Sequence, residues 1–98
     1  MKTFIAITLV GGALILSSAF RAPLSGKSLF TENCIRCHGE DGTRGFLGAK
    51  NLRKSTLADS AIILKITNGR RIMPSFKKRF TPEEIREVME YVKTLRKT

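Results

Sequence analysis

The last third of the chain shows the clearest pattern of apolar and polar positions. Its apolar residues recur at spacings of three and four, which places them on one face of a helix: Ile85, Val88, Met89, Val92 and Leu95. Thr81 stands just before Pro82, and this pair suits an N-cap followed by a first helical position. Glu83 and Glu84 come next, where carboxylates complement the helix N-terminus. The pattern therefore predicts a helix that begins at Pro82 and reaches about Leu95.

Two shorter stretches also have helical spacing. The first runs from Ser25 to about Asn33, and Ser25 is its candidate N-cap. The second begins at Ser55 or Thr56 and stops before Gly69, with apolar side chains at Leu57, Ala58, Ile62, Ile63 and Ile66. No alternating pattern of any length indicates a strand. We therefore predict an all-α fold with about three helices.

The segments between these helices have the composition of loops. Residues 39–48 contain four glycines, which disfavour both helix and strand. We expect this segment to fold closely over a flat ligand. Residues 70–80 form a second, basic loop that contains Met73 followed by Pro74.

Residues 1–19 have the anatomy of a secretory signal peptide. A short positive start precedes an uncharged apolar run over residues 4–16, and small residues follow, ending in Ala19. We predict cleavage after Ala19, or alternatively after Ala22, which leaves residues 20–98 as one exported domain, expected in a bacterial periplasm. An uncleaved segment would instead anchor the same domain to the membrane, facing away from the cytoplasm.

The formal net charge of +10 limits the classes of partner. A basic surface attracts nucleic acid, anionic lipid or acidic proteins. An exported protein rarely meets nucleic acid, so we expect no nucleic-acid partner. Lys77, Lys78 and Arg79, close to Met73, form the cluster best placed to dock an acidic protein face. A generally basic, solvated surface explains the same charges equally well.

The main candidate for chemistry is Cys34-Ile35-Arg36-Cys37-His38, which holds both cysteines and the only histidine of the chain. C-x-x-C-H is the attachment signature of a c-type haem. Two thiols at this spacing can add to two vinyl groups of one porphyrin, and the adjacent imidazole can reach the iron. A redox dithiol usually accompanies a βαβ pattern, which is not visible here. A zinc site would need to recruit Glu40 or Asp41 as a fourth ligand, and a bare disulfide leaves the histidine unexplained.

A haem bound through His38 needs a ligand on its other face. No second histidine exists, so the candidates are methionine sulfurs. Met89 falls on the apolar face of the last helix, where a core role is the better interpretation. Met73 lies in a loop before Pro74, which fixes the backbone, so Met73 is the candidate ligand. Simple packing of Met73 remains the alternative.

At this point the chain resembles the class I cytochromes c, and the small bacterial monohaem members in particular. The resemblance extends from Gly26 to Leu95. It is carried by the C-x-x-C-H motif, by Met73-Pro74-Ser75-Phe76, and by three helix residues in the right order: Gly26, Phe30 and Tyr91.

The resemblance implies a cytochrome c fold wrapped around one covalently bound haem c. It implies thioether links at Cys34 and Cys37, with His38 and Met73 as the two axial ligands of the iron. It also implies that the first helix crosses the last one, Gly26 and Phe30 meeting it near Tyr91.

Three features of this implied site stay open. A carbonyl in the region of residues 48–52 is expected to accept the second N–H of the proximal histidine, although the proline often found there is absent. Phe46 and Phe76 either cover haem edges or belong to the core. Arg44 and Lys50 are candidate partners of the haem propionates.

The function that follows is electron transport, because both axial positions are filled and no metal site is open to substrate. We expect a monomeric electron carrier rather than an enzyme, and redox proteins with acidic docking faces as its partners. Membrane contact is expected only through an uncleaved N-terminal segment or a membrane-bound partner. The alternative is a haem-containing enzyme subunit, or a ligand sensor in which Met73 is displaceable.

Overall fold

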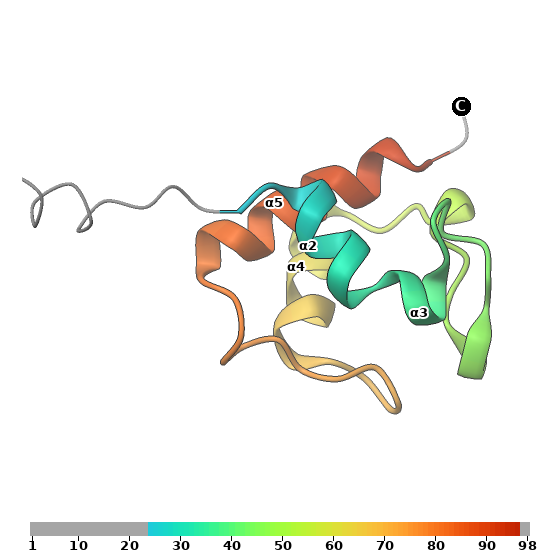
Figure 1. Cartoon of the computed structure of the whole chain (residues 1–98), viewed down its shortest axis with the longest axis horizontal. Coiled ribbons are helices and arrows are strands. Elements are labelled where there is room, and N and C mark those ends of the chain that lie inside the picture. The colour runs from blue at the N-terminus through green and yellow to red at the C-terminus, as the bar shows by residue number, and fades with distance from the viewer. Residues whose placement is uncertain (1–23, 97–98) are drawn as a thin grey trace, which may run out of the picture.

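The computed structural model describes residues 24–96 (Figure 1). The predicted signal peptide, with its alternative ends at Ala19 and Ala22, lies outside the described residues. Over the described range the chain forms helices and loops and no strand, which confirms the all-α prediction. The elements in chain order are α2 (Gly26–Asn33), α3 (Ile35–His38), the 3-10 turns η1 (Phe46–Gly48) and η2 (Leu52–Lys54), α4 (Asp59–Asn68) and α5 (Pro82–Thr94).

Helix α5 begins where the sequence predicts. The Thr81 Oγ1 accepts a hydrogen bond from the Glu84 N–H at 3.1 Å, and the Glu84 carboxylate accepts the Thr81 N–H at 3.0 Å. This reciprocal capping box satisfies two of the backbone donors that every helix N-terminus leaves unpaired. Pro82 occupies the first turn, as expected.

Helix α2 is also capped as predicted, since the Ser25 hydroxyl accepts the Ser28 N–H at 3.2 Å. The helix stops at Asn33, however, and a separate one-turn helix, α3, carries the rest of the C-x-x-C-H motif. Cys34 joins the two helices with φ −116° and ψ −26°, a departure from regular helix geometry. The motif is therefore presented at a bend rather than along one continuous helix.

Helix α4 begins at Asp59, so the predicted start at Ser55 or Thr56 is wrong. In a helix that started at Ser55 or Thr56, the Leu57 carbonyl would accept the Ala61 N–H. Here the Ala61 N–H donates to the Ala58 carbonyl at 3.0 Å, and the Arg96 guanidinium donates to the Leu57 carbonyl at 2.6 Å. The predicted end is confirmed: helix α4 stops at Asn68, and Gly69 is its C-cap.

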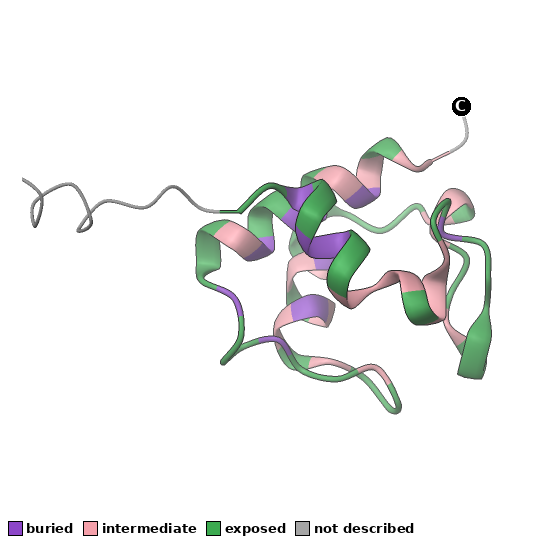
Figure 2. Cartoon of the chain, viewed as in Figure 1, coloured by how far each residue is buried: buried purple, intermediate pink, exposed green. Residues whose placement is uncertain are grey.

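The core lies where α2 and α4 pack against α5, and Figure 2 shows the buried positions gathered between these helices. Phe30 of α2 stacks at an angle on Tyr91 of α5, with ring centroids 5.3 Å apart. Met89 is only 3 % exposed, which confirms its predicted core role. The buried hydrophobic set is Leu29, Phe30, Ile62, Ile66, Phe76, Phe80, Ile85, Val88, Met89 and Val92.

Gly26 permits the close crossing of α2 and α5, because a Cβ at this position would overlap the backbone carbonyl of Glu87. We expect Gly26→Ala to destabilise the fold by about 1–3 kcal/mol, the usual penalty of an overpacked core. Chemical denaturation of the mature protein measures this, with Lys27→Ala as control, since Lys27 is the exposed neighbour of Gly26 in the same helix. Equal stability of Gly26→Ala and the parent protein would contradict the close crossing.

Candidate functional site

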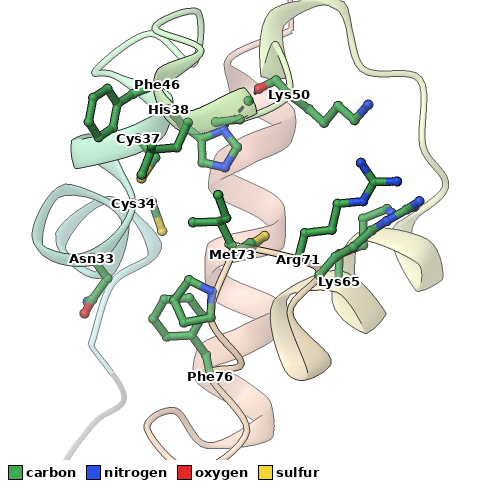
Figure 3. A pocket seen from close by; sticks show the side chains of 16 residues that line it. Asn33, Cys34, Cys37, His38, Phe46, Lys50, Lys65, Arg71, Met73 and Phe76 are labelled. Carbon is green, nitrogen blue, oxygen red and sulfur yellow. Dashed lines mark hydrogen bonds between the residues drawn. The ribbon is translucent and has the colours of Figure 1, made fainter.

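A cavity of about 360 Å³ lies between the α2–α3 bend and the loop over residues 70–76 (Figure 3). All four residues that the sequence singled out line it: Cys34, Cys37, His38 and Met73. Glu40 and Asp41, which a zinc site would have to recruit, are not among its lining residues. The fold therefore brings the thiols, the imidazole and the thioether to one space, although Met73 is 35 residues from His38 in the sequence.

The two cysteines lie on the same side of this cavity, next to each other (Figure 3). Both are half-buried free thiols. Burial, and to a smaller extent the neighbouring Cys37, raises the pKa of the Cys34 thiol to about 11. The short helix α3 holds Cys37 one turn beyond Cys34, because the Cys37 and His38 N–H groups both donate to the Cys34 carbonyl.

His38 is oriented by a single hydrogen bond. Its Nδ1 lies 3.1 Å from the carbonyl oxygen of Lys50. A carbonyl only accepts, so Nδ1 carries the proton and Nε2 keeps its lone pair. Burial lowers the pKa of the imidazole below its ordinary value, which favours the neutral form that binds metals. Lys50 is thus the residue within the region 48–52 whose carbonyl orients the imidazole.

The glycine-rich loop brings the Lys50 carbonyl to His38 through backbone hydrogen bonds. The Arg44 N–H donates to the His38 carbonyl at 2.8 Å, which turns the chain back directly after the motif. The Leu52 N–H donates to the Gly42 carbonyl, also at 2.8 Å. The first bond turns the chain back before Lys50, and the second ties the segment just after Lys50 to the start of the loop. Every residue of the segment has a backbone carbonyl, so the sequence could not indicate that the Lys50 carbonyl accepts the His38 hydrogen bond.

Met73 approaches from the side opposite His38. Figure 3 shows its side chain in the space between His38 above and Phe76 below. Its backbone is fixed by a tight turn, in which the Arg70 N–H donates to the Met73 carbonyl at 3.0 Å and the Met73 N–H donates to the Arg70 carbonyl at 2.9 Å. Within that turn Arg71 has a positive φ of 55°, which is uncommon for a residue with a side chain.

Among the described residues, every charged side chain that lines the cavity is positive. These side chains are Lys50, Lys65, Arg70 and Arg71. Lys50 was a predicted propionate partner and lines the cavity. Arg44 was predicted too, but it does not line the cavity, and its guanidinium lies over the Phe46 ring at 5.2 Å.

The other three cations were missed. The Arg70-Arg71 pair beside Met73 was visible in the sequence, whereas the orientation of Lys65 depends on how α4 packs.

Apolar side chains complete the walls and the rim. Phe76 is 2 % exposed and lines the cavity as well, so it belongs to both the core and the site. Phe46, Leu47 and Ile72 also line the cavity, with exposures of 43 %, 57 % and 62 %. They therefore form an exposed apolar rim. Lys77, Lys78 and Arg79, the predicted docking cluster, are not among the lining residues.

The residues present fit a covalently attached haem. The cavity volume falls within the range of about 300–1,000 Å³ that is typical of cofactor sites. A pair of thiols on one side, a neutral imidazole and a thioether on facing sides, and cations for carboxylate groups match the chemistry of that group. Figure 3 places Lys50, Lys65 and Arg71 on the side away from the cysteines, as a ring with vinyl groups on one half and propionates on the other requires.

Comparison with known sequences also indicates a haem protein. The sequence model of the family described as "Cytochrome C oxidase, cbb3-type, subunit III" matches residues 21–92. A cytochrome c6 of a Nostoc species is 36 % identical, covering 94 % of this chain and 92 % of that protein. A cytochrome c6 of Thermosynechococcus vestitus is 34 % identical, covering 93 % of this chain and 89 % of that one.

Solved structures with the same arrangement of helices are also cytochromes. The c-type cytochrome KustC0563 is similar with a TM-score of 0.70 and 30 % identity, covering 76 % of this chain and all of that one. Cytochrome c6 from the diatom Phaeodactylum tricornutum has a TM-score of 0.60 and 33 % identity, covering 68 % of this chain and 85 % of that one.

Proposed function

The chain belongs to the class I cytochrome c family, and from that premise we propose that it carries single electrons between redox proteins on one covalently bound haem c. The observation that supports this most is the placement of His38 and Met73 on facing sides of one cavity, with both cysteines beside them. It is an electron carrier rather than an enzyme, since these two side chains would leave the iron no free position for a substrate.

Each of the four residues has a defined part in this proposal. Cys34 and Cys37 would hold the haem through thioether links, and His38 and Met73 would bind its iron. The bound haem supplies an iron that gains and loses one electron, at a potential that a His/Met ligand pair raises. The Lys50 carbonyl fixes the imidazole plane, which in metal sites raises ligand basicity and sets orientation. The apolar core around Phe76 keeps water from the Met73 side.

Redox titration tests the carrier function directly. The matured protein is expected to titrate reversibly as a one-electron couple, with a slope of about 59 mV per tenfold change in the ratio of oxidised to reduced protein. Absorbance recorded against applied potential measures it. A two-electron slope, or an irreversible change on reduction, would contradict a single-electron carrier.

The rim of the cavity is the proposed docking surface for a partner with an acidic face. Lys65, Arg70 and Arg71 line the cavity, as do the exposed apolar side chains of Leu47 and Ile72. Charged groups steer encounters, while apolar contact at the centre excludes water once the proteins meet. The Lys77–Arg79 cluster predicted from the sequence lies off this rim, where it can add to long-range attraction.

Small inorganic oxidants distinguish these two basic regions. Reversing the charge of Lys65, Arg70 and Arg71 with glutamates is expected to slow oxidation by the hexacyanoferrate(III) anion at least about tenfold at low ionic strength, since steering of this kind changes rates by about 10–10³. The same change should speed oxidation by the tris(phenanthroline)cobalt(III) cation. Stopped-flow mixing at several salt concentrations measures both rates.

The matched control carries glutamates at Lys77, Lys78 and Arg79, so that the total charge changes equally. Its effect on both oxidants is expected to be smaller, because the altered charges are farther from the cavity. A larger effect in this control would make the Lys77–Arg79 cluster the docking surface, as the sequence alone suggested.

We also propose that the protein is an exported monomer that works in the periplasm, on the strength of its N-terminal residues and its cytochrome c6 relatives. Among the described residues, 24–96, no helix combines the length and the apolar character needed to cross a bilayer. Sedimentation of the mature protein and fractionation of the expressing cells test the two parts of this proposal separately.

A further inference from the structure

The last turn of α4 is attached to the chain segment that follows Met73. A helix leaves its final carbonyls without partners inside the helix. Here the Ile66 carbonyl accepts the Phe76 N–H at 3.0 Å, and the Thr67 carbonyl accepts the Ser75 hydroxyl at 2.6 Å. Ser75 also accepts the Lys77 N–H at 3.3 Å. Residues 75–77 are therefore tied to a helix that packs on the core.

Gly69, the C-cap of α4, lies directly under the backbone of Met73. Its φ of 72° and ψ of −179° fall in a region that is essentially accessible to glycine alone. A Cβ at this position would lie 2.5 Å from the Met73 carbonyl oxygen and 2.7 Å from the Pro74 carbonyl carbon. Real Cβ atoms do not come that close to other heavy atoms, so any side chain at residue 69 must push the Met73–Pro74 backbone away.

These contacts fix Met73 from both sides. Before it, the turn with Arg70 uses both its N–H and its carbonyl. After it, Ser75 and Phe76 are bound to α4, and beneath it Gly69 leaves room for the backbone. Met73 itself is only half-buried where it packs against the core, so these backbone contacts add to its packing in holding it in place.

We propose that Gly69 and Ser75 are positioning residues that set how firmly Met73 occupies the sixth position of the iron. This inference rests on the proposed function, in which Met73 is the distal ligand. Gly69 supplies the space that lets the Met73 backbone sit against α4, and Ser75 supplies the hydrogen bond that keeps it there. Neither residue contacts the iron; both act through Met73.

Binding of imidazole to the ferric protein tests the proposal, since added imidazole must displace Met73. Gly69→Ala is expected to raise the affinity for imidazole at least about tenfold, and to weaken the ferric methionine–iron absorption band. Ser75→Ala, which removes the two exposed hydrogen bonds of the Ser75 hydroxyl, is expected to raise the affinity about two- to tenfold. Both are measured by spectral titration of the purified holoprotein.

The controls are chosen to match each change. Gly45→Ala also places a side chain at a loop glycine of positive φ, 66°, but its Cβ meets no atom closer than 3.8 Å. Ser55→Ala also removes a hydroxyl that accepts a backbone N–H, away from Met73. Imidazole affinity in both controls should equal that of the parent protein. Affinities raised equally in variants and controls would overturn the proposal, because general loosening of the fold would then explain them.

Combination with Met73→Ala separates this inference from the function on which it rests. If Gly69 and Ser75 act through Met73, adding either change to Met73→Ala produces no further rise in imidazole affinity. An additive rise would overturn the positioning role. Failure of Met73→Ala itself to open the iron would overturn the proposed ligand. Should Gly69→Ala fail to fold, Ser75→Ala alone decides the outcome.

Discussion

Replacing Cys34 and Cys37 together with alanine is expected to abolish covalent haem attachment and to leave the mature chain largely unfolded. The two thiols line one side of the cavity and are the only cysteines in the chain. The predicted cleavage would leave a chain of roughly 75–80 residues, a size at which a protein core alone is marginal. We therefore expect the core to need the apolar group that the two thiols are proposed to hold.

Two measurements on the expressed protein check this expectation. Haem-dependent peroxidase staining after denaturing electrophoresis reports covalent attachment, and far-ultraviolet circular dichroism reports helix content. Single variants, Cys34→Ala and Cys37→Ala, should each retain one link and some stain. Ser55→Ala serves as an unrelated control. Full staining of the double variant would contradict attachment at these two residues.

Changing Met73 to alanine is expected to open the iron to added ligands and to lower the reduction potential. Where Met73 occupies the sixth position more than about 99 % of the time, its loss raises the apparent affinity for imidazole by about a hundredfold or more. The potential falls because a thioether favours the ferrous state more than the ligands that would replace it. Imidazole titration and redox titration measure the two effects.

Met89→Ala is the matched control, since it removes the same side chain from a different place. Met89 is 3 % exposed on α5, within the core. Its loss is expected to destabilise the fold by about 2–5 kcal/mol, as for other buried large-to-small changes, while the iron stays closed. Imidazole binding to the iron of Met89→Ala, but not to that of Met73→Ala, would instead assign Met89 as the iron ligand.

Much of this architecture is predictable from the sequence, because local rules agree with the final packing. The N-cap at Thr81 and the apolar face of α5 depend on spacing alone, and both were found as predicted. The bond by which the Glu84 carboxylate completes a capping box was not predicted. The C-x-x-C-H motif gathers three of the four candidate haem-binding residues within five residues. Met73 was identifiable by elimination, since the chain has no second histidine and Met89 belongs to a helix face.

Other features depend on contacts between distant segments, which sequence patterns do not record. The start of α4 was placed too early because the Arg96 guanidinium takes the Leu57 carbonyl from 39 residues away. The Lys50 carbonyl could not be singled out, because every residue carries one. Lys65 joins the cavity rim only because the end of α4 meets the loop that carries Met73. The sequence identifies Gly69 as the residue that ends α4. It does not show that the missing side chain of Gly69 leaves room for the Met73 backbone.

The most direct test of the central claim is the visible absorption spectrum of the ferric, matured protein with and without added imidazole. The account predicts a low-spin spectrum with the weak methionine–iron band, unchanged by imidazole at concentrations that fully convert Met73→Ala. A high-spin spectrum, or immediate conversion by imidazole, would mean that Met73 does not hold the iron. The protein would then be a haem enzyme or ligand sensor rather than a closed electron carrier.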